Sequence, residues 1–168
     1  MKRFIVVFFV LLLPSFALCD SKEMYIEGVT LRIGMTKDEA RTALLKSNLD
    51  VKPMGDSGGY SIGSATGPPY EHYGSFSFDK NERINWISRE WGSFKGSQVV
   101  SLGKTLYNCL NKHDGKGFIL TTDYGSQPGF AITSIRLSSA DGTEILISIS
   151  DSPKYGNGVG IHESLRAK

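Results

Sequence analysis

Cysteine and histidine are scarce in this chain of 168 residues, which contains only two cysteines and three histidines. Cys19 and Cys109 cannot build the multiply bridged framework of a disulfide-rich scaffold. His72, His113 and His162 stand far apart in the sequence, so none has a second ligand at the short spacing of metal motifs. We therefore expect neither a disulfide scaffold nor a metal or other cofactor. A zinc site assembled only by the fold is the remaining alternative.

A surplus of either charge is also missing. The sequence has 19 Lys and Arg residues against 17 Asp and Glu residues, but Lys2 and Arg3 belong to an N-terminal segment that contains no acid. Without that segment, basic and acidic residues are equal in number. A neutral balance gives no electrostatic reason to expect nucleic acid or an anionic membrane surface as a partner.

Apolar runs long enough to cross a membrane are absent, because Phe4–Leu13 contains only ten residues and a transmembrane helix needs about 20. A basic start, a short apolar core, a proline and then small residues are instead typical of an export signal. We expect residues 1–19 to be a signal peptide that is cleaved after Ala17 or after Cys19. The mature protein is then periplasmic or secreted.

Cys19 leaves an alternative for the N-terminus. Lipoprotein processing attaches lipid to a cysteine at the end of the signal, but it favours a small residue before that cysteine, and Leu18 is large. We therefore expect no stable membrane anchor unless Cys19 is lipidated. A disulfide between Cys19 and Cys109 can form only if cleavage leaves Cys19 on the mature chain.

Two segments have the pattern of amphipathic helices. Thr36, with Glu39 three residues later, forms a capping box and predicts a helix that runs to about Ser47. An apolar stripe at helical spacing predicts a second helix over residues 97–113. Alternating apolar residues predict strands after each helix, at 74–79, 83–91, 118–123, 130–138, 143–150 and 159–164.

This order, helix then strands, occurs twice along the chain. Consecutive strands joined by hairpins, such as the one at Asp141-Gly142, favour antiparallel pairing. We predict an α+β fold in which helices pack on one face of an antiparallel sheet. A finer hypothesis is two tandem helix-plus-strands halves, residues 20–94 and 95–168, that share one compact unit.

Residues 52–74 lack the alternation and are rich in glycine, proline and serine. We predict a long loop, and long ordered loops are often functional. A mobile connector is the alternative. The segment also carries three tyrosines and one histidine, namely Tyr60, Tyr70, Tyr73 and His72.

Trp86 and Trp91 are five residues apart, so in a regular strand they face opposite sides. We expect Trp86, beside Ile84, in the core and Trp91 exposed at the end of the strand. Tyr and Trp dominate interface hot spots because they combine a large contact area with a polar group. We predict a binding surface made of Tyr60, Tyr70, His72, Tyr73 and Trp91. The alternative is that all of these aromatic residues are core or loop packing.

No catalytic motif is complete. Ser57 lies in a Gly-Asp-Ser-Gly-Gly segment like that of trypsin-like proteases, but no histidine precedes it. Ser101 and Lys104 match the S-x-x-K motif of penicillin-interacting enzymes without its two partner motifs. Gly103-Lys104-Thr105 ends like a phosphate-binding loop, but the first glycine of that motif is replaced by Gln98.

Residues 33–40, Ile-Gly-Met-Thr-Lys-Asp-Glu-Ala, resemble the opening of the SmpA/OmlA family and of β-lactamase-inhibitor-protein-like domains. The resemblance extends over residues 29–91. It implies a helical stretch that leads into an antiparallel sheet, in an exported protein that binds other proteins without catalysis. The inhibitor version repeats this unit in tandem, as the second helix-and-strands half suggests here.

These observations predict an extracytoplasmic protein-binding module that is not an enzyme. Its partner would be another envelope or secreted protein, in an inhibitory, protective or assembly role. The alternatives are a small envelope hydrolase with an unrecognised site, and a binder of a small ligand or glycan. An exposed aromatic patch favours binding, whereas a pocket that joins a histidine to a serine or a carboxylate favours the hydrolase.

Overall fold

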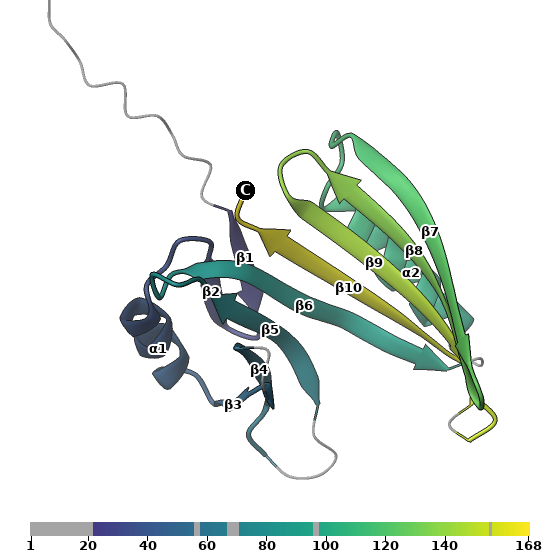
Figure 1. The fold of residues 1–168 in the computed structure, drawn as a ribbon, viewed down its shortest axis with the longest axis horizontal. Coiled ribbons are helices and arrows are strands. Elements are labelled where there is room, and N and C mark those ends of the chain that lie inside the picture. The colour runs from purple at the N-terminus through teal and green to yellow at the C-terminus, as the bar shows by residue number, and fades with distance from the viewer. Residues whose placement is uncertain (1–21, 56–57, 67–70, 96–97, 155) are drawn as a thin grey trace, which may run out of the picture.

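A computed structural model describes residues 22–55, 58–66, 71–95, 98–154 and 156–168, and it has a mixed α+β architecture in which strands dominate (Figure 1). The helices are α1 (Lys37–Leu45) and α2 (Val99–Asn111). The strands are β1 (Glu23–Ile26), β2 (Val29–Arg32), β3 (Leu49–Pro53), β4 (Gly59–Ser64), β5 (His72–Phe78), β6 (Ile84–Lys95), β7 (Phe118–Gln127), β8 (Phe130–Ser139), β9 (Thr143–Asp151) and β10 (Gly158–Arg166).

Eight of these strands form one antiparallel sheet in the order β3-β4-β5-β6-β10-β9-β8-β7, and β1 and β2 form a separate hairpin. In the sequence, α1 is followed by β3–β6 and α2 by β7–β10. Each set of four strands runs from one edge of the sheet to its centre, where β6 pairs with β10. The prediction of an α+β fold with an antiparallel sheet is therefore confirmed.

Helix α1 begins where its capping box predicts. The Thr36 hydroxyl accepts a hydrogen bond from the Glu39 backbone N–H, and the Glu39 carboxylate accepts one from the Thr36 backbone N–H. These two bonds satisfy backbone donors that have no partner within the first turn of a helix. The helix ends at Leu45, slightly before the predicted end, because the chain turns at Ser47 to enter β3.

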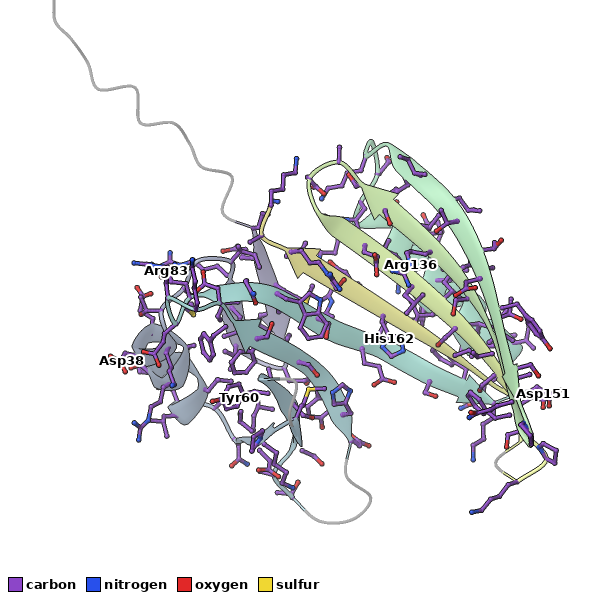
Figure 2. The ribbon with its side chains drawn as sticks, in the orientation of Figure 1. Asp38, Tyr60, Arg83, Arg136, Asp151 and His162 are labelled. Carbon is purple, nitrogen blue, oxygen red and sulfur yellow. The ribbon has the colours of Figure 1, made fainter. Side chains whose placement is uncertain are left out.

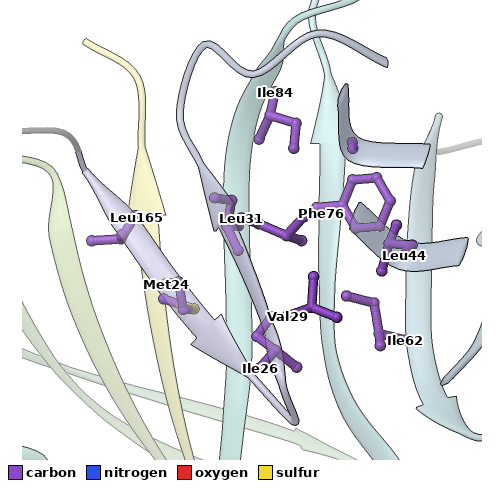
Figure 3. Close-up of a cluster of buried hydrophobic side chains, with 11 residues drawn as sticks. Met24, Ile26, Val29, Leu31, Leu44, Ile62, Phe76, Ile84 and Leu165 are labelled. Atoms are coloured by element: carbon purple, nitrogen blue, oxygen red, sulfur yellow. The ribbon is translucent and has the colours of Figure 1, made fainter. Parts of the chain in front are cut away.

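The first hydrophobic core lies between α1, the β1–β2 hairpin and the sheet (Figure 3). Its buried side chains are Met24, Ile26, Val29, Leu31, Ala40, Leu44, Ile62, Phe76, Ile84, Ile87 and Leu165. These residues come from seven elements of the chain, so the hairpin and α1 are held to the sheet by burial of apolar surface.

A second core lies under α2. Cys109, Ile145 and Ile161 are buried there, and Leu102 and Leu106 of the helix pack against them. In Figure 1, α2 lies behind β8–β10, far from α1. Val99 and Val100 at the start of α2 stay exposed. Within the described part of the chain, no helix is both long enough and apolar enough to cross a membrane.

The prediction of a long loop over 52–74 is wrong. Strands β3, β4 and β5 occupy much of this region, and Gly74 serves close packing within it. A Cβ atom on Gly74 would lie 2.3 Å from the carbonyl oxygen of Ser88, so only glycine fits at this point of the sheet. Residues 56–57 and 67–70, which include Ser57 and Tyr70, lie outside the described residues.

Candidate functional site

Glu163 is a buried carboxylate near the centre of the sheet. It lies on β10 between Ile161 of the second core and Leu165 of the first, and alternation along the strand places all three on one face. Its exposed fraction is 1%. An isolated carboxylate at such a position would cost several kcal/mol, so it needs partners that stabilise its charge.

Four side chains supply hydrogen bonds to Glu163. Its Oε2 accepts from Arg89 Nε at 3.0 Å, from Arg89 Nη2 at 2.8 Å and from Trp91 Nε1 at 2.9 Å. Its Oε1 accepts from Lys112 Nζ at 2.9 Å and contacts His113 Nε2 at 3.0 Å. Burial alone would raise the pKa of Glu163, but the hydrogen bond from Lys112 and the charge of Arg89 lower it to about 2.

Burial also shifts the pKa values of two neighbours of Glu163, Cys109 on α2 and His113 just after it. Burial lowers the pKa of His113, so the ring is neutral at neutral pH and its Nε2–H donates to Glu163. Burial and the Glu163 charge raise the pKa of the Cys109 thiol to about 11. Cys109 is a free, buried cysteine, and a thiol with such a pKa is unreactive at neutral pH.

Glu163 also fixes an arginine–tryptophan pair. Arg89 Cζ lies 4.0 Å from the centroid of the Trp91 ring, and both side chains hydrogen-bond to the same carboxylate oxygen. Arg89 Nη1 also donates to the Tyr25 carbonyl at 3.2 Å, which ties the pair to the β1–β2 hairpin. The guanidinium and the indole are therefore held in one arrangement before any ligand arrives.

This pair lies beside a cleft of about 270 Å³, which we call the aromatic cleft. Tyr25 is 59% exposed, and Tyr73 donates its hydroxyl to Glu71 at 3.0 Å. Such a cleft offers aromatic surface with charged groups beside it. It is lined by Tyr25, Ile26, Glu27, Tyr73, Arg89, Glu90 and Trp91.

The structure brings together only some of the predicted binding residues. Tyr73 and Trp91 line the aromatic cleft, and His72 contacts Glu90 at its edge. Tyr60 does not join them: it packs against the first core, with its ring centroid 5.2 Å from that of Phe76, and lies beside α1 (Figure 2). Tyr70 lies outside the described residues.

The expected roles of the two tryptophans are also wrong. Trp91 is half-buried and packs against the second core, whereas Trp86 is half-buried and belongs to neither hydrophobic cluster of the described residues. An irregularity in the pairing of β5 and β6 explains this, because Ser77 pairs with Trp86 and Phe78 with Ile84, which leaves Asn85 as an extra residue. Such a bulge changes which side chains of a strand face the core: Ile84 and Ile87 are both buried, and Arg89 and Trp91 share the inward face with Ile87.

His72 lies between a serine and a carboxylate. Its Nδ1 is 3.0 Å from Glu90 Oε2, and its Nε2 is 3.1 Å from Ser75 Oγ. The order of groups is that of a hydrolytic triad, but the serine is only 3% exposed. It also lies in the middle of β5, which pairs on both sides, so the backbone N–H groups around it serve the sheet rather than an oxyanion.

Sequence reasoning missed Glu163, although a signal was present. Val159 and Ile161 in the predicted strand and Leu165 just after it alternate, and Glu163 occupies an inward position of that alternation. A charged residue at a position predicted to be buried requires a partner. His113, on the apolar stripe of the second predicted helix, was the matching signal on the other side of the contact.

Among the described residues, no group of three or more His, Cys, Asp or Glu side chains is arranged to hold a metal ion. No model of a known protein family matches this chain, and no match was found among curated proteins or solved structures.

Proposed function

We propose that this protein is an extracytoplasmic protein-binding module without catalytic activity, and that the aromatic cleft is its contact site. The observation that carries the proposal is the Arg89–Trp91 pair, held by the buried Glu163 beside Tyr25 and Tyr73. Trp, Tyr and Arg are the side chains that contribute most to hot spots at protein interfaces.

Rigidity strengthens the argument for binding. Ordering a long side chain at an interface costs about 0.5–1.5 kcal/mol, and Arg89 and Trp91 are already ordered by their hydrogen bonds to Glu163. Binding of a partner to Arg89 and Trp91 therefore does not require these two side chains to be ordered first. Such preorganisation raises affinity without additional contacts.

The charges around the cleft indicate the chemistry of the partner. The guanidinium of Arg89 is engaged with Glu163. Two carboxylates also line the cleft: Glu27 at the turn of the β1–β2 hairpin, and Glu90 on β6, which contacts His72. This arrangement favours a partner segment that presents a Lys or Arg beside an apolar side chain. The apolar side chain would pack on Tyr25 and Tyr73, and the cation would approach the two carboxylates.

The proposal extends to the arrangement of the two parts of the chain. We infer that residues 20–94 and 95–168 are tandem halves with their helices on one face of the sheet. The order of strands in the sheet, which runs from each edge to the β6–β10 centre, supports this inference. It is the arrangement implied by the resemblance of residues 33–40 to SmpA/OmlA and β-lactamase-inhibitor-protein-like domains. Export through the signal at residues 1–19 would bring the module to an envelope or secreted partner.

The test uses site-specific photo-crosslinking in the cells that produce the protein. A photoreactive phenylalanine derivative at Tyr25, on the cleft, is compared with the same group at Tyr124, which is 67% exposed on β7. We expect a discrete crosslinked partner from position 25 and none from position 124. The partner should then be retained by the purified wild-type protein and by the variant Tyr124→Ala, and lost from Tyr25→Ala.

Tyr124→Ala is a matched control because it removes an exposed tyrosine of the same kind from the other half of the sheet. Crosslinking from position 124 alone, or equal retention of the partner by both alanine variants, would show that the aromatic cleft is not the contact site.

A further inference from the structure

A second cavity lies between α1 and the strands β3, β4 and β5, on the side of the molecule where Tyr60 is found (Figure 2). We call it the α1 groove. Its volume is about 380 Å³, which is within the usual size of a small-molecule site, roughly 300–1,000 Å³. It is lined by Lys37, Ala40, Arg41, Leu44, Leu45, Ser47, Leu49, Val51, Tyr60, Phe76 and Phe78.

The inner surface of the groove is apolar and firmly packed. Tyr60, Phe76 and Phe78 form a mutual aromatic cluster, with ring centroids 5.2–5.8 Å apart. Ala40 and Leu44 of α1 face this cluster and belong to the first core. The walls are therefore fixed by the core of the protein, and the groove does not depend on a ligand for its shape.

The charged groups of the groove have one sign. Lys37 and Arg41 are four residues apart on α1 and thus share one side of the helix. Lys37 donates to Glu82 at 2.9 Å, and that bond raises the pKa of Lys37. The residues that line the groove include no aspartate or glutamate. Because Lys37 is already paired with Glu82, an occupant with an apolar body and one negative group would match the walls and the charge of Arg41.

We propose that the α1 groove binds an amphiphile with an apolar chain and a carboxylate, of the fatty-acid class. The chain would lie against Tyr60, Phe76 and Phe78, and the carboxylate would meet Arg41. A peptide fits less well, because the walls are apolar side chains and its backbone N–H and C=O groups would lose their hydrogen bonds to water there. An alkyl chain has no such groups to satisfy.

The experiment measures binding of cis-parinaric acid, whose fluorescence rises in an apolar site, to the full mature protein. We expect a saturable rise with one site per chain, which is reversed by palmitate. Palmityl alcohol has the same chain without the carboxylate, and it should compete at least tenfold less well, since a charge-assisted contact is worth about that factor.

A second measurement reverses the charge at one residue of the groove. The variant Arg41→Glu should weaken binding of cis-parinaric acid by roughly tenfold or more, because it removes the attracting charge and adds a repelling one. Lys104→Glu makes the same change of charge at an exposed position of α2 and should bind like the wild-type protein. Arg41 is exposed, so both variants are expected to keep the wild-type circular dichroism spectrum and unfolding midpoint.

Three results would overturn the proposal: no saturable fluorescence, equal competition by palmitate and palmityl alcohol, or equal affinity of Arg41→Glu and Lys104→Glu. Equal competition by the alcohol would identify an apolar site without recognition of a carboxylate. The outcome does not depend on the aromatic cleft, because the two sites share no lining residue.

Discussion

At the scale of single residues, Glu163 of β10 links β6 to the end of α2. Its carboxylate bonds to Arg89 and Trp91 of β6 on one oxygen, and to Lys112 and His113 after α2 on the other. Hydrogen bonds from four side chains keep the carboxylate in one orientation, and the same bonds fix the positions of those four side chains. The position of the Trp91 ring in the aromatic cleft therefore depends on a residue that does not line it.

Replacement of Glu163 by glutamine should destabilise the protein by roughly 3 kcal/mol at pH 7. The shift of its pKa from 4.5 to about 2 corresponds to a stabilisation of that size, and the amide cannot accept hydrogen bonds on both sides. Urea unfolding followed by tryptophan fluorescence measures the change. The control is Glu144→Gln, a half-buried carboxylate whose pair with the exposed Arg136 is broken, and this change should cost less than about 1 kcal/mol.

The pH dependence of stability follows from the direction in which folding shifts the pKa of Glu163. Because the pKa of Glu163 is lower in the folded state, its stabilisation is present above about pH 5 and is lost as the pH falls toward 2. The difference in unfolding free energy between wild type and Glu163→Gln should therefore shrink over this range. A difference that stays constant from pH 7 to pH 3 would mean that the charge of Glu163 contributes nothing to stability.

At the scale of elements, α1 is the helix whose start is encoded most locally. Its capping box joins Thr36 and Glu39. The hydrogen bonds that the Glu39 carboxylate accepts from the Thr36 backbone N–H and from the Thr36 hydroxyl lower the pKa of Glu39. The same helix forms one wall of the α1 groove. Loss of the cap should thus affect both the stability of the fold and the shape of the groove.

Thr36→Ala should lower the unfolding free energy by about 1 kcal/mol, the usual value of an N-cap side chain. Thr42→Ala is the matched control, since Thr42 lies inside α1 and donates only to the Asp38 carbonyl at 2.8 Å. Alanine is favoured at such an interior position, so this variant should be unchanged or slightly more stable. Chemical denaturation of both variants decides the point, and equal losses would argue against the capping box.

At the scale of the whole molecule, two groups of four strands meet at the β6–β10 pair, and the aromatic cleft and α1 groove both lie in the N-terminal group with its hairpin and helix. The C-terminal part of the chain contributes Glu163, which holds Arg89 and Trp91 of the cleft in place. It also contributes Lys112 and His113, which hold Glu163. The N-terminal half alone would lack these groups, so we expect the cleft to require the whole chain.

Export can be tested on the whole protein by intact mass spectrometry. The mature chain should begin at Leu18 or Asp20, since small residues precede both cleavage positions. It should carry no lipid, because Leu18 before Cys19 is unfavourable for lipoprotein processing. A mass increase of the size of a diacylglycerol on Cys19 would contradict this and would place the protein on a membrane.

The features that the sequence predicted correctly are local ones. The start of α1 follows from two side chains three residues apart, and the hairpin at Asp141-Gly142 follows from a glycine that adopts a φ of 90°. Strands β8, β9 and β10 follow from alternation along each segment. In all of these, the interactions that decide the structure lie within a few residues of one another.

The tertiary structure alone decided the site. Arg89 and Glu163 are 74 residues apart, and no local pattern pairs them. Strand β4 is stabilised by its neighbours β3 and β5 in the sheet rather than by its own glycine- and serine-rich sequence. Trp91 faces the second core because the pairing between β5 and β6 shifts at Asn85, earlier in the same strand. Long-range pairing and burial outweigh local preference at these positions, since the free energy of a buried contact exceeds that of any single propensity.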